Sequence, residues 1–364
     1  MSSAIARSGT DVAPRHTLSA VERRSMVLAA LAVLLLHLVG WGGLMLLVAP
    51  ARLELGGVEG QVLGVAVGIT AFTLGARHAF DADHIAAIDN TTRRLVAEGR
   101  PATNVGFWFS LGHSTVVVVL AGLVAAGLST LVREATSAES TWNRFTSVWG
   151  PLVAGVFLLV IAAVNVVSLR SSGGHGPAGP VTAVLDRIGT RIRTPRQMYV
   201  VGLLFGLGFD TATEVSLLVL AGSAGVAQLP WWAVMTLPVL FAAGMSTFDL
   251  LEGWVARLAY GRAAERPERL RRYNVGVTAV SVVVAGVVGL VSLSGALSTW
   301  GGWPDPLAWT TTLATDYWGW ALAAVLLATL LRLTVTRARR LGATLEGHVL
   351  GIPERVRRTR GERP

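Results

Sequence analysis

Long stretches without a charged residue constrain most strongly how this chain can fold. They recur along its 364 residues, of which 52% are hydrophobic and only 15% are charged. A soluble protein usually has about 25% charged residues, and an apolar stretch of roughly 20 residues can cross a bilayer as a helix. The sequence therefore predicts an all-α protein, a polytopic bundle of transmembrane helices.

Eight apolar stretches are predicted to be spans. The first is too long for the apolar region of a signal peptide, so we expect it to be retained as a helix. Residues 1–25 are predicted to form a disordered cytoplasmic tail, 26–336 the membrane domain, and 337–364 a basic cytoplasmic tail. The predicted spans are Met26–Ala49, Gln61–Ile88, Asn104–Ser129, Val148–Leu169, Met198–Ala221, Trp231–Ala256, Val275–Leu297 and Asp316–Thr336.

The arginines test this number of spans independently. All 31 basic residues are arginines, and they cluster before the first span and after the second, fourth, sixth and eighth. The loops on the other side hold only Arg52, Arg133 and Arg144. Cytoplasmic loops are rich in basic residues, so this asymmetry predicts eight spans with both termini in the cytoplasm. It also indicates insertion in the plasma (inner) membrane and contact of the basic tail with anionic lipid.

Composition excludes several classes of protein. The chain has no cysteine, which excludes disulfides, thiolate metal sites and iron–sulfur clusters. Its net charge of +9 would suit a nucleic-acid-binding protein, but the hydropathy argues against that class. A nucleotide-binding loop of the G-x-x-x-x-G-K-[ST] type is also absent from the sequence. We therefore expect no nucleic-acid partner and no cofactor, and the sequence does not indicate an oligomeric state.

Ionisable residues inside the predicted spans are the strongest functional signal. Each one costs roughly 2.5–3.5 kcal/mol at the centre of a membrane helix, so it is usually kept for function. They are concentrated on four spans and, judged by depth, on one level between the midplane and the inner leaflet. These residues are Arg77, His78, Asp81, Asp83, His84 and Asp89 on the second span, His113 on the third, Asp210 and Glu214 on the fifth, and Asp249 and Glu252 on the sixth.

Helical spacing brings most of these side chains onto shared faces. Asp210 and Glu214 are four residues apart and Asp249 and Glu252 are three apart, so each pair shares a face. A regular second helix would place Arg77, His78, Asp81, His84 and Asp89 on one arc. Asp83 would then point the other way. Either it bonds a different helix, or the second helix is distorted near this position, and Gly75 is a candidate cause of such a distortion.

Imidazole and carboxylate groups without sulfur suit divalent transition metals such as Ni²⁺, Co²⁺, Zn²⁺ or Mn²⁺. The carboxylates would also balance the charge of a dication in a medium of low dielectric constant. The residues alone therefore predict a metal-ion path and leave the metal open. A buried polar network with a purely structural role is the alternative interpretation.

Four short motifs resemble those of the nickel/cobalt transporter family, which are membrane permeases for Ni²⁺ and Co²⁺. The segment RHAFDADHI at 77–85 contains the pattern H-x4-D-H, formed by His78, Asp83 and His84. The other three follow in the family's order on the third, fifth and sixth spans. They are LGHSTVV at Leu111–Val117, LGFDTATEV at Leu207–Val215 and GMSTFD at Gly244–Asp249.

The resemblance implies a secondary transporter that imports Ni²⁺ or Co²⁺ without ATP hydrolysis and is not an enzyme. It implies that His78, Asp83 and His84 bind the metal. It also implies that further residues line the path, namely Asp81, His113, Asp210, Glu214 and Asp249. The last motif departs from the family pattern, because Leu250 replaces a threonine and Glu252 replaces an aspartate.

The second and third spans also echo the fifth and sixth. GHST at 112–115 is similar to GMST at 244–247, and LGARHAFDADH at 74–84 faintly resembles LGFDTATE at 207–214. The copies are an odd number of spans apart, so they would be inverted, as in many alternating-access transporters.

The sequence leaves two other functions open, metal export and an intramembrane enzymatic activity. Related metal exporters usually carry a long His-rich loop, whereas the loop after the fourth span has only His175. An intramembrane metalloenzyme would need a compact set of ligands, but H-E-x-x-H spacing is absent from the sequence.

Overall fold

The computed structural model describes residues 18–54, 62–125, 140–171, 192–207, 217, 221, 229–263 and 267–308. All of them belong to one compact unit, Met1–Gly319. These residues form helices, with one isolated β-bridge between Glu54 and Val62. The prediction of an all-α fold is confirmed. The eighth predicted span and residues 337–364 lie outside the described residues, as do the first 17 residues of the N-terminal tail.

Five helices in the described part are long and apolar enough to cross a membrane. They correspond to the first, third, fourth, sixth and seventh predicted spans. The first is α1 (Ala20–Gly43), which continues through a π-helical turn (Leu44–Val48) and a 3-10 turn (Ala49–Ala51). The others are α4 (Val105–Ala125), α6 (Thr141–Ser171), α11 (Thr236–Ala263) preceded by the short α10 (Trp231–Val234), and α12 (Pro267–Gly301).

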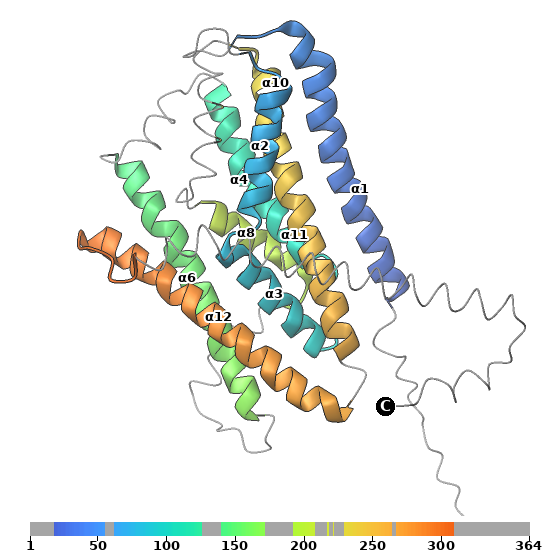
Figure 1. Cartoon of the computed structure of the whole chain (residues 1–364), viewed down its shortest axis with the longest axis vertical. Coiled ribbons are helices and arrows are strands. Elements are labelled where there is room, and N and C mark those ends of the chain that lie inside the picture. Colours follow the sequence, from blue (N-terminus) through green and yellow to red (C-terminus); the bar gives the residue numbers. More distant parts are fainter. Residues whose placement is uncertain are drawn as a thin grey trace, which may run out of the picture. The chain divides into compact units, whose positions relative to one another are not determined.

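The second predicted span is divided between two helices, α2 (Val65–His78) and α3 (Ala82–Ala97) (Figure 1). The fifth begins with a 3-10 turn (Pro195–Gln197) and α8 (Met198–Gly206), and most of its remainder lies outside the described residues. Because these helices are short, neither segment has an apolar helix of spanning length among the described residues.

Helix α11 occupies the centre of the described bundle and packs against α1, α2, α3 and α4. Helix α4 also packs along α8, and α6 pairs with α12. Glycines allow several of these approaches, such as Gly75 and Gly244 between α2 and α11 and Gly112 and Gly202 between α4 and α8, as is usual where membrane helices pack closely. Helix α1, in contrast, exposes leucines such as Leu31, Leu35 and Leu38, which suits a surface that faces lipid.

Polar side chains fix α1 to the rest of the bundle near its N-terminus. Ser19 and Glu22 form a reciprocal capping box, which satisfies backbone N–H groups of the first turn. The same Glu22 carboxylate lies 3.5 Å from the guanidinium of Arg257 on α11, and both side chains are buried. Asn104, just before α4, donates to the backbone and side-chain oxygens of Ser25 at 2.8 and 2.7 Å. These contacts tie α1, α4 and α11 together at one end.

Candidate metal site

The break between α2 and α3 determines the geometry of the candidate site. The N–H groups of Phe80 and Asp81 donate to the carbonyls of Arg77 and His78, three residues back, so the last turn of α2 tightens and the helix ends. Asp81 then adopts the extended conformation of an N-cap residue and α3 begins. The prediction of a single continuous helix is therefore wrong, and so is the prediction that residues 77–89 share one arc of it. The distortion lies at Ala79–Asp81 and not at Gly75.

The break brings two histidines that are six positions apart into contact. The rings of His78, at the end of α2, and His84, in the first turn of α3, are 4.5 Å apart between centroids. In a continuous helix they would lie more than one turn apart along the axis. Irregular backbone of this kind is tolerated inside a membrane protein where it is buried or lines a site.

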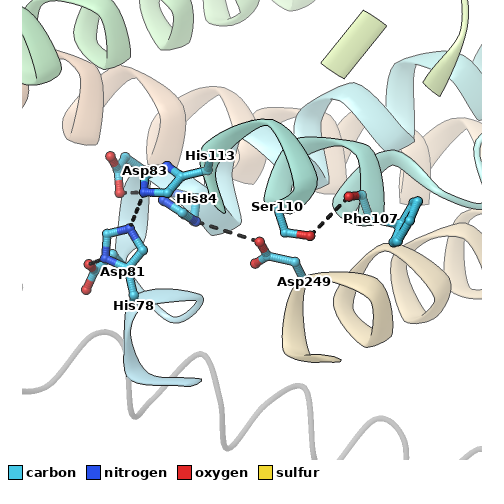
Figure 2. A network of polar contacts seen from close by, with 8 residues as sticks. All are labelled: His78, Asp81, Asp83, His84, Phe107, Ser110, His113 and Asp249. Atoms are coloured by element: carbon cyan, nitrogen blue, oxygen red, sulfur yellow. Dashed lines mark hydrogen bonds and ion pairs between the residues drawn. The ribbon is translucent and has the colours of Figure 1, made fainter. Parts of the chain in front are cut away.

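His113 on α4 completes a cluster of three histidines (Figure 2). Its Nε2 atom lies 3.0 Å from Nε2 of His78, and its ring centroid is 5.0 Å from that of His84. One nitrogen from each of the three rings can be chosen so that all lie within 4.8 Å of one another, and all three side chains are buried. Metal–imidazole bonds are about 2.0–2.1 Å long, so a small inward movement would let one ion bind all three rings.

Asp249 on α11 adds a carboxylate beside this cluster. Its Oδ2 atom lies 3.9 Å from Nδ1 of His84, which is too long for a hydrogen bond, and the side chain is fully buried. Neither carboxylate oxygen has a hydrogen-bond partner among the described residues. A buried carboxylate without hydrogen bonds is costly, and a divalent ion at the histidines would compensate for that cost.

Two aspartates at the helix break orient the cluster. Asp81 leaves the backbone of α3 uncapped, and its Oδ2 atom instead lies 3.1 Å from Nδ1 of His78. This contact favours the tautomer of His78 that leaves Nε2 free of its proton for a metal. Asp83 lies in the first turn of α3, where a negative charge is favourable, and accepts a hydrogen bond from the N–H of His84 at 3.0 Å.

Aromatic side chains surround the three imidazoles. Phe109 and Phe205 contact His84 edge-on, with centroid distances of 4.8 and 6.4 Å, and Phe241 lies 5.7 Å from His78. An apolar wall limits access of water and strengthens the attraction between an ion and its ligands. The arrangement can hold a dication between imidazole nitrogens, with carboxylates at its edge.

The structure brings together six of the eight predicted site residues: His78, Asp81, Asp83, His84, His113 and Asp249 (Figure 2). The other two, Asp210 and Glu214, lie outside the described residues. Arg77, which the helical arc placed with these groups, has an exposed side chain. Sequence reasoning left Glu252 out of the site, yet it is buried one turn after Asp249. The three-residue spacing from Asp249 was the signal that could have included it.

Comparison with known proteins assigns the chain to a family. The profile of the family described as "High-affinity nickel-transport protein" matches residues 64–336, a segment that contains the three histidines and Asp249. The chain belongs to this family. The family transports nickel and its members are not enzymes, in agreement with the resemblance drawn from the four motifs.

Several curated relatives cover most of the chain. The nickel transporter NicT of Mycobacterium tuberculosis is 43% identical over 323 residues, which are 84% of this chain and 83% of the relative. The nickel transporter NixA of Staphylococcus aureus is 37% identical, covering 85% of this chain and 93% of its own. The cobalt transport protein NhlF of Rhodococcus rhodochrous is 39% identical, covering 76% and 82%. Comparison with solved structures gives no match.

Proposed function

We propose that this protein imports Ni²⁺, Co²⁺ or both across the plasma membrane, without hydrolysing ATP. The observation that carries the proposal is the buried cluster of His78, His84 and His113 at the α2–α3 break. It lies in a chain whose relatives include two nickel transporters and a cobalt transport protein. Three imidazoles and a carboxylate form a borderline ligand set that suits these two metals.

The proposed topology has eight spans with both termini in the cytoplasm. It is supported by the five apolar helices and by the distribution of arginines in the sequence. In this topology α2–α3 together make the second span and α8 begins the fifth. The metal path would include Asp210 and Glu214 of the fifth span besides the residues around the three histidines.

We further propose that the second and third spans and the fifth and sixth form an inverted repeat. Support comes first from the contact of α2 with α11. A Cβ atom added at Gly75 would lie 2.0 Å from the carbonyl oxygen of Phe241, and one at Gly244 would lie 2.3 Å from that of Phe72. The two helices therefore cross with backbone against backbone.

The contact of α4 with α8 has the same reciprocal form. A Cβ atom added at Gly112 would lie 2.0 Å from the carbonyl oxygen of Tyr199, and one at Gly202 would lie 1.9 Å from that of Phe109. An inverted repeat would relate the second span to the fifth, and therefore α2 to α8. It would also relate the sixth span to the third, and therefore α11 to α4, so that the α2–α11 crossing corresponds to the α8–α4 crossing.

A shared sequence pattern at the two crossings agrees with this relation. In each of the four helices an aromatic residue lies three positions before the glycine. The carbonyl oxygen of that aromatic residue lies against the glycine of the opposite helix. The four copies of aromatic-x-x-glycine are FTLG at 72–75, FSLG at 109–112, YVVG at 199–202 and FAAG at 241–244. In alternating access, two such helix pairs would move relative to each other around the histidine cluster.

Uptake of radiolabelled nickel tests the proposed function. The full chain would be expressed in a bacterial host that lacks its own nickel importers. We expect cellular nickel to rise with the wild-type protein and to return to background with His84→Ala, while His37→Ala serves as the control. Nδ1 of His37 donates a hydrogen bond of 3.0 Å to the carbonyl oxygen of Val33 in its own helix. A fall in cellular nickel would indicate export instead, and unchanged nickel would refute transport of this ion.

A further inference from the structure

A second group of buried carboxylates extends from the histidine cluster along α11. Glu252 follows Asp249 by one helical turn, and its side chain is only 7% exposed. Its Oε1 atom is buried and has no hydrogen-bond partner in the described part of the chain. Both oxygens of Asp249 are likewise buried without a hydrogen-bond partner among the described residues, so α11 carries two such carboxylates one turn apart. The packing of α11 on α3 brings a third carboxylate, Asp89, against the same helix.

The packing of α3 on α11 holds Asp89 at this position. A Cβ atom added at Gly253 would lie 3.9 Å from the side chain of Ile88, and the small glycine allows the helices to approach there. The hydroxyl of Tyr260, two turns further along α11, donates a hydrogen bond of 2.5 Å to Oδ1 of Asp89. This contact turns one side of the Asp89 carboxylate towards Tyr260 and fixes its orientation.

A buried arginine lies at the far end of the group. Arg93 follows Asp89 by one turn of α3, and its side chain is buried. Its guanidinium also donates to Oδ1 of Asn90 at 3.3 Å, and that oxygen accepts a hydrogen bond from Asn165 of α6 at 3.1 Å. Because Arg93 lies one turn from Asp89 on the same helix, it can balance part of the charge there, whereas Oε1 of Glu252 has no hydrogen-bond partner among the residues that the structure describes.

A purely structural role accounts poorly for Glu252. A buried polar group that stabilises helix packing is expected to have partners, as Asn90 and Asn165 have. An acid whose buried oxygen lacks a partner destabilises the bundle unless something else binds it. Because three carboxylates together attract positive charge, the missing partner is most simply a cation.

We propose that Asp249, Glu252 and Asp89 form a second site for a divalent cation, one step along the path from the three histidines. The inference rests on the proposed function, because it assigns to the transported ion a second resting place. The donors here are oxygens alone, and Ni²⁺ and Co²⁺ bind such sets less tightly than imidazole. The ion therefore moves from a tighter nitrogen site to a weaker oxygen site, which favours its release. Asp249 lies between the two sites and contributes to both.

Counting bound ions tests the second site. The full chain is purified into lipid nanodiscs and dialysed against saturating radiolabelled Ni²⁺. We expect two ions per wild-type chain, the second of lower affinity. Glu252→Gln is nearly isosteric and should retain the tighter ion and lose the weaker one, and Asp89→Asn should do the same. The matched control is Glu98→Gln, at the C-cap of α3, because Glu98 is partly exposed and pairs with Arg94 and Arg100. This variant should still bind two ions.

The outcomes separate this inference from the proposed function. If Glu252→Gln retains the tighter ion, the variant is folded. His84→Ala should lose the tighter ion. One ion per wild-type chain, or two in Glu252→Gln, would overturn the second site and leave the transport function intact. A wild-type chain that neither binds nor takes up nickel would overturn both.

Discussion

The Nε2 atoms of His78 and His113 lie 3.0 Å apart, although the residues are 35 positions apart in the sequence and belong to different helices. Two imidazoles at this distance can share one proton or bind one metal ion. His84 lies against both rings, so the pair is part of a three-nitrogen cluster. The proposed import of nickel or cobalt depends on this cluster.

Asp81→Asn tests how the cluster is oriented. The carboxylate lies 3.1 Å from Nδ1 of His78, and groups of this kind typically raise metal affinity by about 10–100-fold. We expect nickel binding by the purified protein to weaken within that range without loss of folding. Asp305→Asn is a suitable control, because Asp305 accepts a hydrogen bond from Ser294 and lies far from the cluster in sequence. An affinity equal to that of the wild type would contradict an orienting role.

Gly75→Ala tests the crossing of α2 and α11. The new methyl group would lie 2.0 Å from the carbonyl oxygen of Phe241, so the helices must separate. Overpacking of this kind usually costs about 1–3 kcal/mol, and we expect a lower midpoint of thermal unfolding in detergent. In Gly286→Ala on α12 the methyl group meets nothing within 4 Å, so stability should be unchanged or slightly higher. Equal midpoints for the two variants would argue against the close crossing.

The ion pair between Glu22 and Arg257 should stabilise the contact of α1 with α11. Both side chains are buried, and removing one partner of a buried pair costs about 3–5 kcal/mol because the other charge is left alone. Arg257→Met should therefore lower the unfolding midpoint strongly, and Glu22→Gln in the same chain should restore part of the loss. Additive losses in a double-mutant cycle would show that the two residues do not interact.

Asn165 offers a test of packing that leaves the metal site alone. Its side chain donates to Asn90 at 3.1 Å and joins α6 to α3. Hydrogen bonds between membrane helices contribute about 0.6 kcal/mol on average. Asn165→Leu should lower stability by about that amount while nickel affinity stays at the wild-type value. A large loss of nickel binding would place Asn165 on the ion path instead.

Much of the fold could be predicted from the sequence because long apolar runs leave few alternatives. Helices α4, α6 and α12 follow directly from such runs, and the composition excluded a soluble fold. The break at Ala79–Asp81 could not be predicted, because residues 77–84 contain no proline and the nearest glycine is Gly75, which lies within a regular helix. What decides the break is the local hydrogen bonding and the contact of Asp81 with His78.

The site could be predicted only as a set of residue types. Spacing along one helix predicted that Asp249 shares a face with Glu252, and the motifs singled out His78, Asp83 and His84. The approach of His113 to His78 depends on how α4 packs, which no local pattern encodes. The burial of Glu252 likewise results from the packing of α11 on its neighbours.

X-ray absorption at the nickel edge of the Ni²⁺-loaded protein counts imidazole ligands, so it shows directly whether the three histidines bind the ion. The spectrum is recorded with one equivalent of nickel, which fills the tighter site. We expect scattering from three histidine rings in the wild-type protein and from two in His113→Ala. A shell of oxygen atoms without imidazole, or the same histidine count in both proteins, would contradict a nickel site formed by His78, His84 and His113.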